Sequence, residues 1–171
     1  MILPNNIQNG DVPDASLLMA NFNALADAIL AVAVSASQSA AAVAITTGTW
    51  TALTLDTEEF DLAGNFASGI FTAPVAGRYL VTFKVNWQAS MPACYLSSGI
   101  FNITTSTWET MNSAFQPVAA NPDQYSTTLA VVCQLAANDQ IRPYVYHSGG
   151  TTKDIVGGGK HMTRFTVVKI N

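Results

Sequence analysis

The spacing of apolar residues changes near Gly48. Before that residue, apolar and small side chains recur in alternating steps of three and four, the heptad pattern of a helix that packs along one stripe. The pattern predicts an α-helix from about 12 to 45, with Asp11 as its N-cap, Pro13 in its first turn and Gly48 as its stop. The stripe consists of Ala15, Leu18, Phe22, Leu25, Ile29, Val32, Ala36, Ser39 and Val43.

A helix of this length with a single apolar stripe is not stable alone in water, because the stripe needs a partner surface. We therefore expect residues 12–47 to form a parallel coiled-coil stalk, although the mixed seam does not fix the number of chains. The alternative is a helix packed on its own domain. Ala28–Ile45 has no charge, but its Ala and Ser content and the absence of Lys or Arg from its flanks argue against a membrane span. The stalk residues that we expect at the seam are Leu18, Phe22, Leu25, Ile29 and Val32.

After Gly48 the period changes to two. Apolar and polar residues alternate over 78–88 and again over 125–135, which is typical of strands with one buried face. Shorter apolar runs are separated by turn residues such as those at 73–77 and 121–123. Many short strands without a second helix predict an all-β sandwich or jelly roll.

The charge content is low for a chain of 171 residues. Charged residues make up 11% of it, against roughly 25% in typical domains. This suggests that part of the surface is buried against other copies. The formal net charge is −4 and every basic residue lies at or after Arg78, so no basic stripe is present and nucleic acid binding is disfavoured.

The sequence offers little catalytic chemistry. His147 and His161 are the two histidines, without carboxylates at ligand spacing, so a metal site is not expected. The glycines at 157–159 before Lys160 lack the context of a phosphate-binding loop. Cys94 and Cys133 lie in strand-like runs and fit no metal or redox spacing, and whether they pair is left open. The sequence therefore predicts no enzyme activity and no cofactor.

An acidic cluster lies between two apolar runs. Carboxylates at such a density can hold calcium, but no fixed ligand spacing is present. We expect a solvated loop. The cluster consists of Asp56, Glu58, Glu59 and Asp61.

The segment 71–83 resembles the signature of the complement component 1q globular-head family, within the tumour necrosis factor jelly-roll superfamily. It reads Phe71-Thr-Ala-Pro-Val-Ala-Gly77-Arg-Tyr79-Leu-Val-Thr-Phe83. The final run around Phe165 is similar to that family's last strands, so the resemblance covers about 50–171. It implies a jelly-roll head, residues 48–171, that forms trimers through aromatic-rich faces. The head residues that it picks out are Phe71, Gly77, Tyr79, Phe83 and Phe165.

The N-terminal segment 9–25 is similar to a segment of bacteriophage tail and fibre proteins. There an Asn-Gly and a later Asn-Phe-Asn-x-Leu precede a helix, as Asn9-Gly10 and Asn21-Phe22-Asn23-Ala24-Leu25 do in this chain. Together the two resemblances imply a trimeric fibre of a virion, on the tail or the head, in which residues 1–11 dock on other virion proteins. The head would attach to a glycan or protein of the host surface, without membrane insertion.

The polar segment 104–124 is the candidate receptor loop. It carries Trp108, Met111 and Phe115 among Ser, Thr and Asn, and aromatic anchors among adaptable polar groups suit carbohydrate or protein contact. The alternative is that these side chains pack inside the sandwich or the trimer. Two other functions also stay open: a fibre that decorates or stabilises the capsid without a receptor, and a secreted bacterial adhesin. The adhesin is disfavoured because the start 1–6 does not resemble a secretory signal.

Overall fold

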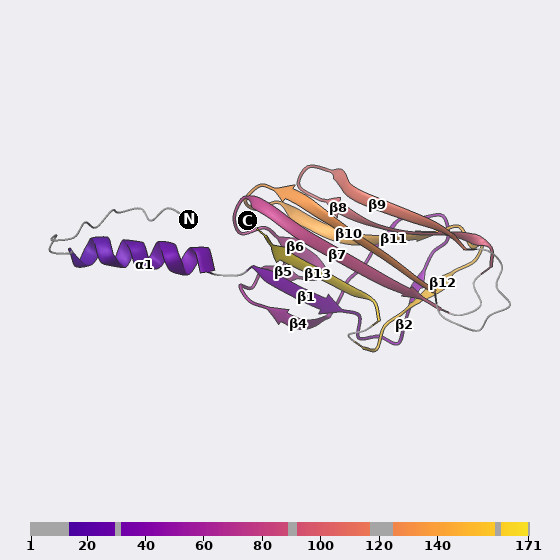
Figure 1. Ribbon diagram of the computed structural model, residues 1–171. Helices are drawn as coiled ribbons and strands as arrows, with labels where there is room; N and C mark the ends of the chain where they lie inside the picture. The colour runs from indigo at the N-terminus through magenta and orange to yellow at the C-terminus, as the bar shows by residue number, and fades with distance from the viewer. Residues whose placement is uncertain (1–13, 30–31, 89–91, 117–124, 160–161, 171) are drawn as a thin grey trace. The chain divides into compact units, whose positions relative to one another are not determined.

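The computed structural model describes residues 14–29, 32–88, 92–116, 125–159 and 162–170. The chain divides into two compact units, residues 1–31 and 32–171. The first contains the helix α1 and the second contains all the strands (Figure 1). No helix in the described ranges is long and apolar enough to cross a membrane.

Helix α1 spans Ala15–Ile29. Asp14 is its N-cap, since its Oδ1 accepts hydrogen bonds from the backbone N–H and the hydroxyl of Ser16, each at 2.8 Å. The predicted cap, Asp11, lies outside the described residues. On the exposed surface of α1 stand large apolar side chains, which are 40–56% accessible: Leu17, Leu18, Met19 and Phe22.

The predicted continuation of the helix to residue 45 is wrong. Strand β1 covers Ala33–Ser37 and strand β2 covers Ala42–Ile45, both in the second unit. Val32, predicted for the stalk, is 5% exposed and belongs to the hydrophobic core of that unit. The long coiled coil is therefore absent from residues 33–45. The side chains of residues 24–29 lie outside the described part, so Leu25 and Ile29 are placed on α1 by their backbone alone.

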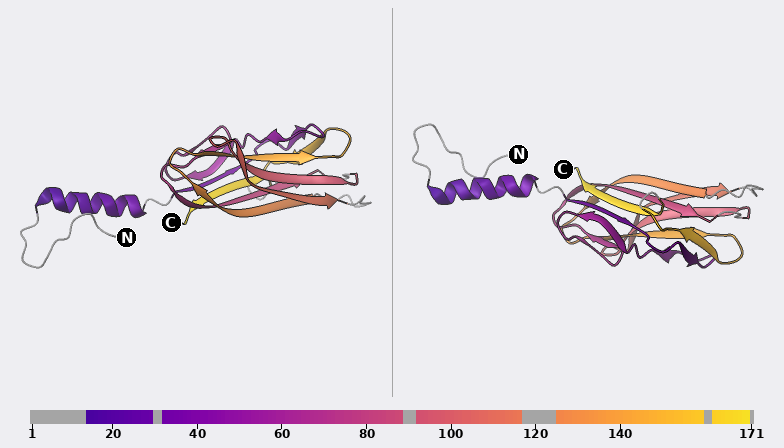
Figure 2. Two further views of the ribbon diagram at one scale, coloured as in Figure 1. Left: turned by 90° about the horizontal axis from the view of Figure 1, so that it is seen from above. Right: turned by 90° about the horizontal axis from the view of Figure 1, so that it is seen from below.

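The second unit is a sandwich of two antiparallel sheets, which Figure 2 shows as two layers. Sheet A has the order β2-β12-β7-β13-β1-β4, and β10 pairs with β7. Its further strands are β4 (Thr57–Asp61), β7 (Gly77–Trp87), β10 (Tyr125–Leu135), β12 (Lys153–Val156) and β13 (Arg164–Lys169). Sheet B has the order β5-β6-β11-β8-β9, and β3 pairs with β11. Its strands are β3 (Thr51–Ala52), β5 (Phe66–Ala67), β6 (Ile70–Thr72), β8 (Cys94–Asn102), β9 (Thr107–Gln116) and β11 (Gln140–His147).

The two longest strands, β7 and β10, pair along their whole length, from Tyr125 opposite Trp87 to Leu135 opposite Gly77. Every second residue of β7 from Tyr79 to Trp87 is buried, because alternate side chains of a strand point to opposite faces. The core between the sheets is filled by large side chains that are less than 2% exposed: Trp87, Tyr79, Phe71, Phe83, Phe165, Ile45, Leu53, Leu55, Leu96, Ile100 and Leu135.

The aromatic residues that the resemblance picks out, Phe71, Tyr79, Phe83 and Phe165, lie in this core, while the half-buried Gly77 begins β7. The rings of Phe71 and Tyr79 meet edge to face at 5.6 Å, and those of Phe83 and Phe165 at 6.4 Å. The hydroxyl of Tyr79 donates to the backbone oxygen of Val75 at 2.6 Å, which ties β7 to the turn before it. Burial raises the pKa of this phenol, so it remains a donor. These residues therefore hold the sandwich together from within.

The beginning and the end of the second unit lie at the same end of the sandwich. Strands β1 and β13 pair antiparallel, with Ala33 opposite Val168. Next to this pair, the backbone N–H of Lys169, the last residue of β13, donates to the oxygen of Val32, which precedes β1, at 2.8 Å. The start of β1 and the end of β13 therefore lie side by side.

Candidate assembly and binding surfaces

An apolar row crosses the outward face of sheet A. Val132 on β10 and Val168 on β13 lie opposite Leu80 on β7, and Ala33 on β1 lies opposite Val168. Val132 is 52% exposed and Leu80 is 37% exposed. Four neighbouring strands therefore present one continuous apolar row on the side of the sheet that faces away from the core. We call these four residues the sheet A row.

The next row along sheet A is small and uncharged. Ala130 lies opposite Thr82, and Thr82 lies opposite Thr166, which pairs with Ser35. One step further come two cations, Lys84 and Arg164. The Nε of Arg164 donates to the hydroxyl of Ser35 at 2.7 Å. On the other side of the sheet A row, one step along β7, lies the exposed Arg78, opposite Gln134 on β10. The stretch of this face between Arg78 and the Lys84–Arg164 pair carries no charge on β10, β7, β13 and β1, so it is suited to packing against another protein surface.

The outward face of sheet B carries a packed group of aromatic rings. Trp108 on β9 lies at its centre, with its ring centroid 4.6 Å from that of Trp50 and 5.1 Å from that of Phe101. Tyr144 on β11 lies 5.6 Å from Trp108 and 5.7 Å from Phe101. Tyr146 lies 5.5 Å from Trp50. All five side chains are half-buried. We call them the aromatic cluster.

Gly99 on β8 makes room for the central ring. A Cβ atom at this position would lie 2.7 Å from Cζ3 of Trp108 and 3.1 Å from Cε3. The indole therefore lies against the sheet over a strand residue that has no side chain, an arrangement that only glycine permits.

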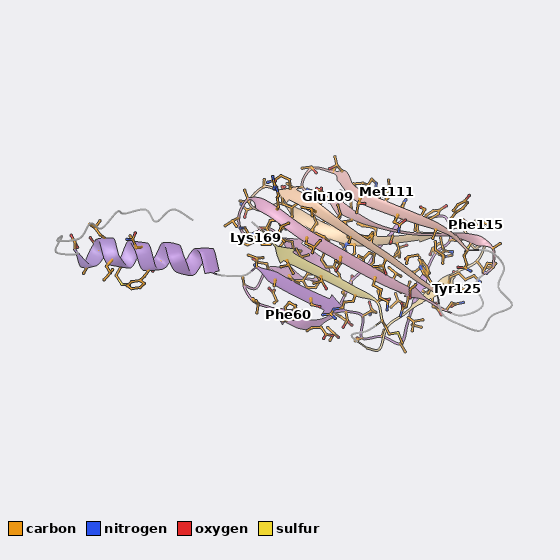
Figure 3. The ribbon with its side chains drawn as sticks, in the orientation of Figure 1. Phe60, Glu109, Met111, Phe115, Tyr125 and Lys169 are labelled. Atoms are coloured by element: carbon orange, nitrogen blue, oxygen red, sulfur yellow. The ribbon has the colours of Figure 1, made fainter. Side chains whose placement is uncertain are left out.

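The predicted receptor loop is in fact a strand over part of its length. Trp108, Met111 and Phe115 all lie on β9, the edge strand of sheet B, and residues 117–124 lie outside the described residues. Figure 3 labels Met111 and Phe115 on this strand. The prediction of a loop is wrong because an edge strand carries polar side chains on its exposed positions. Phe115 contacts Tyr95 on β8 at 5.2 Å between centroids. Met111, Phe115 and Tyr95 are 53–57% exposed, so they extend the apolar surface along this edge of the sheet.

Four members of the aromatic cluster, Trp50, Phe101, Tyr144 and Tyr146, were not singled out from the sequence. A signal did exist: Tyr144 and Tyr146 alternate with buried residues on β11, which places aromatic rings on the outward face.

His147 is a buried structural residue. Its Nε2 donates to the backbone oxygen of Ile45 at 2.9 Å, and its Nδ1 accepts the N–H of Gly149 at 3.1 Å. The ring also meets Trp87 edge to face at 5.7 Å. Both ring nitrogens are thus occupied by the backbone, which leaves neither available as a metal ligand. His161 lies outside the described residues.

Asp56, Glu59 and Asp61 of the acidic cluster bind different partners. The oxygens of Asp56 accept the N–H and the hydroxyl of Ser39 at 2.8 and 2.6 Å. Asp61 accepts the N–H of Phe66 at 2.9 Å, and Glu59 accepts the hydroxyl of Ser37 at 3.2 Å. The described residues contain no group of three or more His, Cys, Asp or Glu side chains that could hold a metal ion.

Replacing Asp56 by alanine is expected to lower the stability of the head by about 0.5 kcal/mol at neutral pH, a small value because the side chain is exposed. The hydroxyl of Ser39, and then its N–H, hold the pKa of Asp56 below its usual 3.8. A lowered pKa stabilises the fold above pH 3.8, and this contribution is lost as the pH falls through the lowered value. Urea unfolding of the parent and of Asp56→Ala at pH 7 and pH 2.5 measures the difference in their free energies of unfolding. Glu58→Ala is the exposed control. A difference between the parent and Asp56→Ala that persists at pH 2.5 would contradict the assignment.

Both cysteines are free and buried. Burial, and after it the nearby carboxylate of Glu109, raise the pKa of the Cys133 thiol to about 12. Burial also raises the pKa of Cys94, while Lys153 acts in the opposite direction.

We expect Cys133 to react with iodoacetamide at pH 8 about a thousandfold more slowly than an ordinary thiol, because only the thiolate is nucleophilic. Cys94 should react faster than Cys133, and both should react at once in guanidinium chloride. Mass spectrometry over time measures the labelling. Stoichiometric labelling of Cys133 within minutes in the native protein would show that the site is not buried as described.

A cavity of about 440 Å³ opens beside the β5–β6 hairpin. The amide Nδ2 of Asn65 at its wall is buried without a hydrogen-bond partner. The side chains that line the cavity have no ionisable group, so they offer hydrogen bonds but no proton transfer. They belong to Asn65, Phe66, Ala67, Ser68, Ile70, Thr72 and Gln140, together with the backbone of Gly64.

No protein-family model matches the chain, and comparison with curated proteins finds no relative. Solved structures do resemble it. The globular domain of zebrafish complement 1qA protein superposes with a TM-score of 0.60 at 14% identity, over 81% of this chain and 97% of that one. Eiger TNF from S. frugiperda gives 0.61 at 13% identity, over 82% and 93%. Murine APRIL at pH 8.5 gives 0.57 at 11% identity, over 82% and 99%.

At sequence identities of 11–14%, the likeness to these structures shows the fold alone. The head is an all-β jelly-roll sandwich of the type found in complement C1q and TNF, which confirms the predicted class of the head. The resemblance to bacteriophage fibre proteins is not tested by these comparisons and stays a prediction.

Proposed function

We propose that this chain is the subunit of a homotrimeric bacteriophage fibre that attaches the particle to its host and performs no chemistry. In this proposal the sheet A rows of three heads meet around an axis, and the trimer itself is carried over from the resemblance to the complement 1q family. The observation that carries the proposal is the sheet A row, in which Val132 and Leu80 remain half-exposed in the single chain. Burying such a row stabilises an assembly by about 25 cal/mol for each Å² removed from water.

Helix α1 supports the same arrangement. Leu18 and Phe22 are 40% and 55% exposed, and an isolated helix of 15 residues is only marginally stable in water. Three such helices, packed along these side chains, would form a stalk shorter than the one predicted from the sequence. Residues 1–11, which lie outside the described residues, would dock on the virion, as the similar phage segment implies.

Adsorption of particles tests the attachment role. Particles that lack this protein should adsorb to host cells at least tenfold more slowly, and the purified chain should compete with intact particles. Unchanged adsorption together with reduced heat stability of the particles would defeat the receptor role and favour a fibre that only stabilises the capsid.

A further inference from the structure

We propose that the aromatic cluster on sheet B binds an uncharged saccharide. The inference rests on the proposed attachment function and names the surface and the ligand class that it uses. The five rings form a single patch, because each contacts at least one other member with centroids 4.6–5.7 Å apart. A pyranose ring presents C–H groups on its faces, and these pack on the electron-rich faces of aromatic rings.

The patch is held in place before any ligand arrives. Its rings are half-buried against one another and against the sheet, so little side-chain freedom remains to be lost on binding. Gly99 is part of this arrangement, because any larger residue would push Trp108 off the sheet. A glycine inside a strand has no side chain to pack, and here the indole of Trp108 fills that space.

The charge on this face decides the class of ligand. Among the outward-facing residues of β8, β9 and β11, Arg142 is the one charged side chain. Its Nε donates to the backbone oxygen of Leu53 at 3.3 Å and its Nη2 to the hydroxyl of Thr54 at 3.0 Å, so the guanidinium is turned toward the protein. A nucleic acid or an acidic glycan would find no cationic partner beyond this residue. An uncharged ligand needs no cationic partner on this face.

Neutral polar groups accompany the rings. The hydroxyls of Ser97 and Ser113 are 2.7 Å apart on β8 and β9, next to the Met111 and Phe115 positions. The phenol groups of Tyr144 and Tyr146 can each donate and accept a hydrogen bond. Flat apolar surface with a few neutral hydrogen-bonding groups suits a ligand that has both C–H faces and hydroxyls, which describes a neutral sugar.

Titration of the purified full-length chain with maltotriose, cellotriose, N,N′,N″-triacetylchitotriose and lactose tests the inference. Tryptophan fluorescence and saturation-transfer NMR report binding, since Trp50 and Trp108 lie in the cluster whereas Trp87 is buried in the core. At least one of these sugars should bind, and Trp108→Ala should weaken it at least tenfold. Gly99→Ala should do the same while it keeps all five rings. Sialyllactose should bind no better than lactose.

Val75→Ala is the matched control, because Val75 is 48% exposed in a turn outside the cluster and the sheet A row. It should leave sugar binding unchanged. Circular dichroism and the molecular mass check that each variant is folded and assembled like the parent. If Trp108→Ala changes the number of chains in the assembly, the cluster is an interface between copies and the inference is overturned.

Two further results separate this inference from the proposed function. If no sugar in the panel binds, but the chain binds host cells and Trp108→Ala abolishes that binding, the ligand is a protein; the saccharide is then excluded and attachment stands. If the chain binds neither sugars nor cells, attachment itself fails. A preference for sialyllactose would contradict the argument from charge.

Discussion

Replacing Ala36 by aspartate is expected to unfold the head. Ala36 is fully buried on β1, where it lies opposite Phe165 on β13 and Glu58 on β4. A carboxylate at this position would be buried without a partner and would overfill a packed core, which costs on the order of 4 kcal/mol or more. Small domains are stable by only about 5–15 kcal/mol, so most of the stability would be lost. Urea unfolding followed by circular dichroism measures the effect.

Ala42→Asp is the control for this experiment. Ala42 is also an alanine of the predicted stalk region, but it is exposed on β2, so the change should cost less than about 0.5 kcal/mol. In a coiled-coil stalk that continued to residue 45, Ala36→Asp would leave the sandwich intact. Equal stability of the two variants would therefore contradict the placement of β1 inside the sheet.

Replacing Leu80 by arginine is expected to convert the proposed trimer to single chains. Leu80 lies at the middle of the sheet A row, between Val132 and Val168. In a trimer the substitution would bury three unpaired cations at the interface, each at a cost of roughly 2–5 kcal/mol, which weakens association more than a hundredfold. The fold of each head should persist because the side chain points away from the core. Light scattering behind a sizing column measures the mass.

Val75→Arg is the matched control, since it adds the same charge at an exposed apolar position outside the row. Its mass should equal that of the parent protein. A trimer that persists in Leu80→Arg would show that the heads meet through another surface.

The long strands could be predicted from the sequence because their signal is local. Alternation of apolar and polar residues predicted a strand over 78–88, and β7 covers Gly77–Trp87. The strand predicted over 125–135 is β10, with the same limits. In both strands one face is buried in the core, so apolar and polar residues alternate along the sequence.

Residues 33–45 show why the stalk was predicted too long. Val32, Val34 and Ala36 are spaced by two, while Ile29, Val32 and Ala36 are spaced by three and four, so both periods fit the same segment. Ala favours a helix, and this local preference supported the wrong period. What decides the structure is the pairing of β1 with β4 and with β13. No local pattern reveals a partner such as β13, which lies more than a hundred residues further along the chain.

The aromatic cluster could be predicted only in part. Trp108 was singled out because a large aromatic among polar residues suits a binding surface. Its neighbours Trp50, Phe101 and Tyr144 come from other segments of the chain, and the strand order of sheet B brings them together. The role of Gly99 also depends on a contact across two strands, so it becomes visible only in the structure.

The mass of the purified full-length chain in solution tests the central claim most directly. Sedimentation equilibrium over a range of protein concentrations should give three times the mass of a single chain, because the sheet A row and the exposed side chains of α1 need partner surfaces. A single-chain mass at all concentrations would show that the sheet A row stays exposed to water in a monomer, and it would contradict the trimeric fibre.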